Sequence, residues 1–179
     1  MLSSICFLLY QEYFFGDDRM TDTSDNRSFD IKYLESERIV LLPLSQHIVM
    51  DDGIDTWYAI VDKENSVPIG MVGIVHQHPE WRNTGLWITI PDGHNRGEGY
   101  GLEALELVEE YIFDSLAYQR IAVRIADCNQ AAVAFFKKAG YKLEGVQELG
   151  YFHDDQYYDV ILLRLLRKEY QNRQTVKTP

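Results

Sequence analysis

The chain has 179 residues, a net charge of −11 and 46% hydrophobic residues, which fits one globular domain with a buried core. Its acidity, with a pI of about 4.8, argues against nucleic acid as a partner, because such proteins present basic surfaces to phosphates. The charge suits a cationic small molecule or a basic peptide, although charge that only maintains solubility is the simpler explanation. The two cysteines, Cys6 and Cys128, lie far apart and predict a reducing, cytoplasmic location with no disulfide framework and no metal site.

The N-terminal part of the sequence differs from the rest. Residues 5–15 are apolar and aromatic, but this stretch is too short to span a membrane and lacks the preceding basic residues of a signal peptide. Met20 is an alternative start, which would leave 1–19 outside the native protein; an added strand or an interface segment is the other interpretation. We expect three parts: an N-terminal extension or linker (1–30), a single domain (31–170) and a flexible tail (171–179).

Apolar periodicity predicts strands first and helices later. The expected strands of the first half are 39–44, 57–61, 69–76 and 84–90. The expected elements of the second half are a helix over 102–116, a strand over 121–126, a helix over 131–139 ended by Gly140, and a hairpin with arms 141–149 and 156–166. The charged residues from Arg167 onward are expected to fray. This order predicts a mixed α/β sheet.

Three glycines, Gly97, Gly99 and Gly101, lie between an expected strand and the longest expected helix. Glycine costs backbone entropy, so such a run is expected where a ligand must approach the backbone closely. The free N–H groups and the positive dipole end of the following helix favour an anion there. The spacing fits neither a dinucleotide-binding turn nor a Walker loop. The run therefore predicts a phosphate site, with a tight turn alone as the alternative.

The run Arg96-Gly97-Glu98-Gly99-Tyr100-Gly101 resembles the acyl-CoA-binding segment of the GNAT N-acetyltransferase superfamily. A second segment is also similar: Asn129 begins a helix that ends in Lys138-Ala139-Gly140-Tyr141. The hairpin residues 150–159 resemble the branch that acetylates ribosomal-protein N-termini and polyamines. The resemblance implies an α+β fold, with a mixed, mostly antiparallel sheet, a splayed parallel strand pair and helices on both faces. It also implies acetyl transfer from acetyl-CoA to a primary amine of a small molecule, polyamine or protein N-terminus.

The same resemblance implies a set of residues around acetyl-CoA, whose pantetheine arm would pair with a splayed strand while its diphosphate contacts backbone amides. The set is Trp87, Ile88, Thr89, Arg96, Gly97, Glu98, Gly99, Tyr100, Gly101, Leu102, Asn129, Phe136 and Lys138. Plainer roles stay open for several: Asn129 as a helix cap, Arg96 and Lys138 (with Lys137) as solvated charges, and Phe136 as core.

The resemblance implies direct attack by a neutral amine on the thioester, whose carbonyl a strand N–H near Ile88 or Thr89 would polarise. Many relatives protonate the leaving thiolate with a tyrosine, but Phe136 stands at that position. Another branch uses a glutamate base, where this chain has Arg124. In place of these residues, the candidates for a general acid or base are His76, His78, Tyr151 and Tyr158.

The acceptor side also departs from the family pattern. Residues 45–56 leave room for one short helix instead of about two. Residues 1–38, or a second subunit in a homodimer, would then have to complete the acceptor site. Two other functions remain open: a catalytically weak relative that binds acyl-CoA as a sensor, and a structural protein assembled through its aromatic N-terminal segment.

Overall fold

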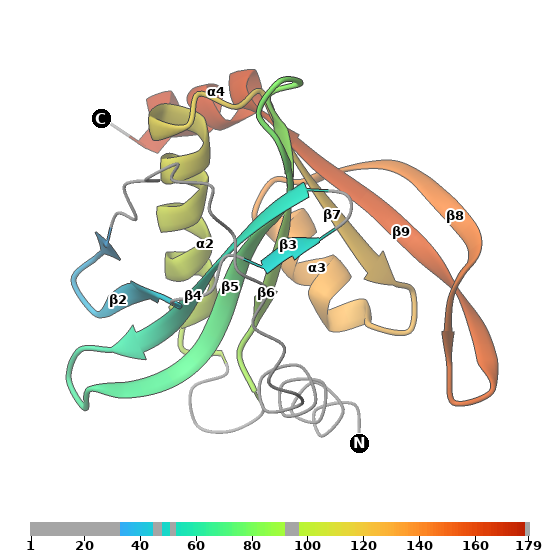
Figure 1. Ribbon diagram of the computed structural model, residues 1–179, viewed down its shortest axis with the longest axis horizontal. Helices are drawn as coiled ribbons and strands as arrows, with labels where there is room; N and C mark the ends of the chain where they lie inside the picture. The colour runs from blue at the N-terminus through green and yellow to red at the C-terminus, as the bar shows by residue number, and fades with distance from the viewer. Residues whose placement is uncertain (1–32, 45–47, 51–52, 92–96, 178–179) are drawn as a thin grey trace.

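A computed structural model of the chain describes residues 33–44, 48–50, 53–91 and 97–177. Nine strands form one sheet in the order β1-β2-β4-β5-β6-β7-β9-β8, and β3 pairs with β4 beside this path (Figure 1). The strands are β1 (Leu34–Glu35), β2 (Ile39–Pro43), β3 (Ile48–Met50), β4 (Gly53–Asp62), β5 (Val67–His78), β6 (Asn83–Thr89), β7 (Arg120–Ala126), β8 (Lys142–His153) and β9 (Gln156–Leu166). The helices are α2 (Tyr100–Glu110), a π-helical turn η1 (Tyr111–Ser115), α3 (Gln130–Lys138) and α4 (Arg167–Lys177).

The sheet is mixed and mostly antiparallel, as predicted. Among the described strands β6 and β7 pair in parallel, and the other neighbours pair antiparallel. The antiparallel strands β4 and β5 are longer than expected, and they pair Tyr58 with Val72, both fully buried. The core cluster takes Tyr58 and Ile60 from β4 and Ile69, Val72 and Ile74 from β5, so both strands contribute to one core.

Helices α2 and α3 pack close together over this core. Leu105 and Val108 of α2 are fully buried and belong to the same core cluster as Val133 of α3. A Cβ placed on Gly101, in the first turn of α2, would lie 3.7 Å from the ring of Phe135 in α3. Residues of α2, α3 and α4 all belong to this one core cluster, and no described residue forms a helix on the other face of the sheet. The expected single helix over 102–116 is also corrected, because its last turn is the π-helical η1.

The prediction that the chain frays from Arg167, with a flexible tail from 171, is wrong through residue 177. These residues form α4, which crosses the end of α2 in Figure 1. Tyr170 is 3% exposed and its ring lies 4.9 Å from that of Phe113. Arg173 donates to the carboxylate of Glu109 and to a backbone carbonyl at the end of α3. This helix is polar along most of its length and is held by tertiary contacts of single side chains such as Tyr170 and Arg173, so periodicity alone gave no signal for it. No helix of the described residues has the length and apolar content needed to cross a lipid bilayer.

Candidate functional site

The parallel strands β6 and β7 separate part of the way along their length. Their pairing begins at Asn83 and Arg120 and ends at Gly85 and Ala122. Beyond that point β6 continues with β5 as its described partner, and β7 continues with β9. We call the diverging segments, 86–89 of β6 and 123–126 of β7, the fork. Since alternate backbone groups of a strand point to each side, the fork presents N–H and C=O groups that no described strand pairs.

A left-handed turn precedes α2, at the same end of β6 as the fork. Gly97 and Gly99 have φ angles of 87° and 89°, a conformation that residues with a Cβ adopt at a cost. Gly99 is the N-cap of α2, and no side chain caps the helix there. Among the described residues, nothing accepts a hydrogen bond from the N–H groups of Gly97 to Gly101. This end of α2 therefore offers unpaired donors together with the positive end of the helix dipole.

The backbone amide of Leu102, one predicted member of the anion site, has a partner inside the turn, and contact of Leu102 with a ligand stays a prediction. The N–H of Leu102 donates to the carbonyl of Gly99 at 3.0 Å, so this amide is already used inside the turn. The amides that remain for an anion are those of 97–101. The predicted contribution of Arg96 lies outside the described residues.

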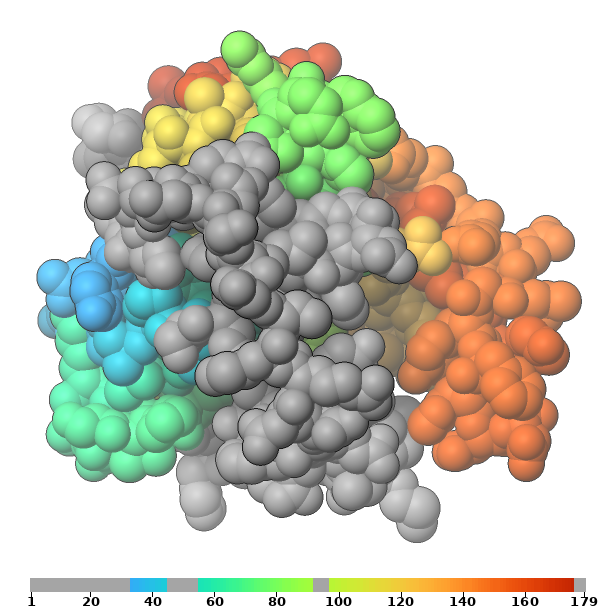
Figure 2. Space-filling view, in the orientation of Figure 1, coloured from blue at the N-terminus to red at the C-terminus, as the bar shows by residue number. Residues whose placement is uncertain are grey.

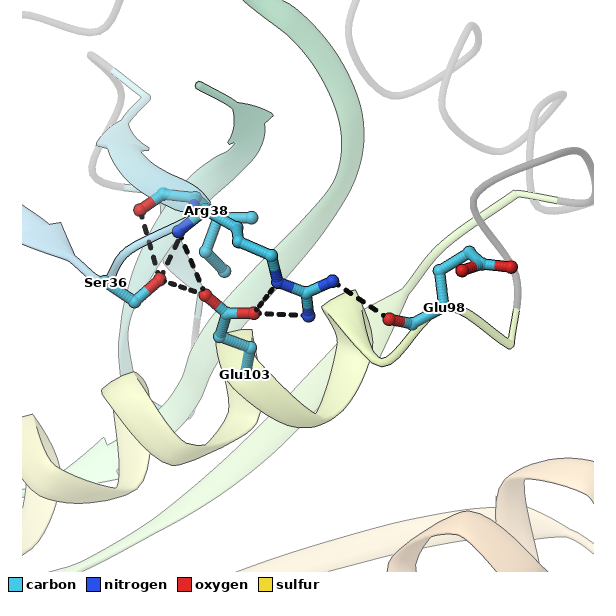
Figure 3. A network of polar contacts seen from close by, with 5 residues as sticks. Ser36, Arg38, Glu98 and Glu103 are labelled. Carbon is cyan, nitrogen blue, oxygen red and sulfur yellow. Dashed lines mark hydrogen bonds and ion pairs between the residues drawn. The ribbon is translucent and has the colours of Figure 1, made fainter. Parts of the chain in front are cut away.

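Sequence reasoning missed a cation at this turn. Arg38, which lies just before β2, donates from Nη1 to the carbonyl of Glu98 at 3.1 Å and from Nε to the carboxylate of Glu103 at 2.8 Å (Figure 3). Its guanidinium carbon lies 4.6 Å from the centre of the Tyr100 ring. No sequence signal joins Arg38 to residues about 60 positions later, so only the fold brings them together.

Glu103 is the centre of this network, in the first turn of α2. Its carboxylate accepts hydrogen bonds from the hydroxyl of Ser36 and from the backbone N–H of Arg38. Partial burial acts to raise the pKa of Glu103, but the bonds from Ser36 and Arg38 outweigh burial and lower it. The carboxylate is therefore ionised near neutral pH, and its negative charge interacts favourably with the positive end of the helix dipole.

The two faces of β6 differ at the fork. Leu86 is 3% exposed and Ile88 packs against the core under the helices, whereas Trp87 points to the other face and is 39% exposed. There the rings of Trp57 and Trp87 meet edge to face, 5.4 Å apart. Gly73 lies between them across the strands, and a Cβ on it would come within 2.6 Å of the Trp57 ring. The sheet thus carries an aromatic pair beside the fork.

The second predicted segment, at α3, is formed as expected. Asn129 is the N-cap of α3, and its Oδ1 accepts from the N–H of Ala132 at 3.2 Å. Phe136 is 3% exposed, between Phe135 and Tyr141; its burial supports the core interpretation, and contact with a cofactor stays a prediction. Lys138 is exposed in the last turn of α3, where the helix dipole favours a cation in any case.

The two predicted histidines lie at different distances from the fork. A bulge in β5 between Val75 and His78 interrupts the alternation on which the prediction of a shared face depends. His76 is exposed in this bulge, and a Cβ on Gly85, where the fork begins, would lie 3.6 Å from its ring. His78 pairs with the far end of β6 and stacks on Trp81, with ring centres 4.6 Å apart. His76 is the histidine nearer the fork.

The other acid–base candidates lie on the β8–β9 side. Tyr151 and Tyr158 face each other across that hairpin, with ring centres 6.4 Å apart, and the Tyr158 hydroxyl donates to Gln156. Both lie beyond Val160, the last residue of β9 that pairs with β7. The hairpin stands off at the right of the molecule in Figure 2. Arg124 lies at the fork, where one branch of the family would have a glutamate base. Its guanidinium donates a hydrogen bond to the side chain of Gln147 in β8 at 2.8 Å.

Here a sheet forks between two parallel strands, and a glycine turn with an uncapped helix N-terminus lies at the open end of the fork. This arrangement is typical of acetyltransferases that use an acyl-CoA donor. Residues 32–142 match the family model of the acetyltransferase (GNAT) domain, and the chain belongs to this family.

Known proteins support this assignment at low identity. Over 114 residues the chain is 24% identical to the SPbeta prophage-derived uncharacterized N-acetyltransferase YokL of Bacillus subtilis (strain 168), covering 64% of this chain and 63% of that protein. The chain thus spans less than two thirds of the curated relative it matches. The structure of the spermidine/spermine N-acetyltransferase SpeG from Vibrio cholerae superposes with a TM-score of 0.61 at 24% identity, over 66% of this chain and 69% of that one. A dodecameric SpeG structure superposes with the same TM-score over 66% and 68%. These likenesses show the shared fold.

Proposed function

We propose that this protein is an N-acetyltransferase that moves an acetyl group from acetyl-CoA to a primary amine. The observation that supports the proposal most is the pairing of the fork with the unpaired amides of 97–101. The fork offers backbone partners to the amide-rich pantetheine arm, and the turn offers donors to the diphosphate. Trp87, Ile88 and Thr89 on one strand and Asn129 at the start of α3 complete the proposed donor site. Arg96 and Lys138 are proposed as additional phosphate contacts.

The proposed reaction is a single displacement. The neutral amine nitrogen attacks the thioester carbonyl carbon, a C–N bond forms, the C–S bond breaks, and the proton lost by nitrogen ends on the CoA sulfur. An N–H of the 86–89 segment polarises the carbonyl oxygen. Of the four acid–base candidates we place His76 first, acting through water, because it is exposed beside the residue where the fork begins. His78, Tyr151 and Tyr158 rank after it.

For the acceptor we propose a small amine that carries further positive charge, such as a polyamine. The fold is shared with a spermidine/spermine N-acetyltransferase, and the chain has a net charge of −11, which attracts cations. The exposed ring of Trp87, beside the fork, is suited to bind a second ammonium group through its π-face. A basic peptide N-terminus is the alternative acceptor.

Calorimetry with acetyl-CoA, followed by a CoA-release assay over a panel of amines, tests these proposals. We expect micromolar binding of acetyl-CoA and turnover with spermidine or spermine. In W87A we expect a larger rise in the KM for these amines than in the KM for acetyl-CoA, since Trp87 is also proposed to line the donor site. Absence of binding at about 1 mM acetyl-CoA would end the proposal. Binding without turnover of any amine would favour the sensor interpretation, and turnover of basic peptides alone would favour the peptide acceptor.

The proposed assembly is a homodimer. Apolar side chains that are exposed on the edge strand β8 support it: Leu143, Val146, Leu149 and Phe152. An unpaired apolar edge favours association with another chain. Light scattering of the full chain and of a chain that begins at Met20 measures the solution mass. The comparison of the two chains also tests whether residues 1–19 take part in the assembly.

A further inference from the structure

We infer that Arg38 is a positioning residue for the donor site: it holds the glycine turn before α2 in the conformation that presents its amides to the diphosphate. The inference rests on the proposed function and adds a residue that lies outside the glycine run 96–101 and the α3 segment. Arg38 lies in the turn between β1 and β2, and its side chain reaches across to Glu98 and Glu103 at the start of α2 (Figure 3).

The contacts of Arg38 reach both sides of Gly99. On the preceding side, Nη1 binds the carbonyl of Glu98 at 3.1 Å. On the following side, Nε binds Glu103 at 2.8 Å and the guanidinium lies over the ring of Tyr100. A Cβ on Gly99 would itself lie 3.4 Å from Nη2. One planar side chain therefore connects the β1–β2 turn, the glycine turn and the first turn of α2.

The bond to Glu98 fixes the direction of a particular amide. In a trans peptide the C=O and the N–H point in opposite directions. Because Arg38 holds the Glu98 carbonyl on its own side, the N–H of Gly99 must point away from Arg38. That N–H has no described acceptor. Arg38 thus turns a donor outward at the centre of the proposed diphosphate site.

Arg38 also balances a charge that opposes the ligand. Glu103 lies in the first turn of α2, next to the proposed diphosphate site, and without Arg38 its carboxylate would repel a diphosphate. Glu103 is held in turn by Ser36 and by the backbone of Arg38. The planar guanidinium of arginine donates to Glu98 and to Glu103 at the same time. The single ammonium group of lysine does not reproduce this geometry.

The test compares a ligand that has the diphosphate with one that lacks it. Dissociation constants for CoA and for pantetheine, and KM and kcat with acetyl-CoA and with S-acetyl-pantetheine, are measured for the wild type, R38A and R38K. K63A is the matched control, since Lys63 binds the same β1–β2 turn through Glu35 and the Ser36 carbonyl but not the glycine turn. Thermal melting of every variant reports on folding.

We expect R38A and R38K to bind CoA roughly tenfold more weakly than the wild type. Their kcat at saturating acetyl-CoA and their constants for pantetheine and S-acetyl-pantetheine should be unchanged. K63A should bind CoA like the wild type. A double variant, R38A with Glu103→Gln, should regain only the part of the loss that is due to repulsion. The inference is overturned if R38A binds CoA like the wild type, if R38K restores full affinity, or if pantetheine binding falls equally. If the wild type itself binds no CoA, the proposed function fails, and the role of Arg38 fails with it.

Discussion

Helix α2 carries two glutamate–arginine pairs in opposite surroundings. Glu103 pairs with Arg38 in its first turn, where the two side chains are 19% and 45% exposed. Glu109 pairs with Arg173 two turns later, where the glutamate side chain is fully buried and the arginine is 23% exposed. The pKa of Glu103 is lowered by its hydrogen-bonding partners against the effect of burial. Burial raises the pKa of Glu109 to about 7, against the attraction of Arg173.

The difference separates a ligand site from a structural contact. The exposed pair spans the glycine turn, where water screens it, so it contributes little to stability but fixes backbone direction. The buried pair joins α2 to α4 and, through the Ala139 carbonyl, to the end of α3. Desolvation makes that pair costly to break. Variants of the two pairs should therefore change different measurements.

The largest effect is expected from Arg173→Met. It leaves the carboxylate of Glu109 buried without its partner, which should cost about 3 kcal/mol of unfolding free energy. Urea unfolding near pH 8 measures the loss, and CoA affinity should stay unchanged. The control is Arg167→Met, since Arg167 lies 3.8 Å from an exposed Asp114 and should cost less than about 0.5 kcal/mol. Equal losses for the two variants would contradict a special role of the buried pair.

The pH dependence of stability is expected to carry the signature of Glu109. Its pKa is about 7 in the folded state against an ordinary value of 4.5, so the folded state binds this proton more tightly. Its contribution is favourable below pH 4.5 and is lost as pH rises through 7, a difference of up to about 3 kcal/mol. Glu109→Gln should flatten unfolding free energy over this range, whereas Glu110→Gln, on the exposed face of α2, should not. An unchanged slope in Glu109→Gln would count against the raised pKa.

The local conformation at the ends of the helices could be predicted from residue types. The cap at Asn129 and the helix end at Gly140 follow from residue types that favour these conformations, and the structure confirms both. The fork itself was anticipated only through the family resemblance. Arg38 and Arg173 act on partners 60 to 65 residues away, where no periodicity or cap connects them. The helix α4 was missed for the same reason, since Tyr170 and Arg173 hold it through tertiary contacts.

A smaller effect is expected from Gly99→Ala, which tests the turn with both ion-pair partners of Glu103 and Glu109 kept, although its Cβ would lie 3.4 Å from Nη2 of Arg38. Alanine at a φ of 89° should cost about 1 kcal/mol of stability and move the turn, which weakens CoA binding roughly tenfold. Gly145→Ala is the control, because a Cβ there lies 3.9 Å from Leu162, an ordinary contact. Calorimetry with CoA and urea unfolding measure both variants. Retention of full CoA affinity by Gly99→Ala would show that the turn conformation does not matter for the ligand.

The smallest stability change is expected from Glu103→Gln, and its sign should be opposite to that of Glu109. Because the folded-state pKa of Glu103 lies below 4.5, its stabilisation is present above pH 4.5 and is lost as pH falls through the lower value. Glu103→Gln should therefore remove stability near neutral pH, by less than about 1 kcal/mol for so exposed a pair, and should lose its effect at about 1 M salt. Unfolding midpoints at pH 3 to 7 in low and high salt measure this. A loss as large as that of Arg173→Met would mean that the exposed pair holds the fold together, and its role would then be structural, not the positioning of a ligand turn.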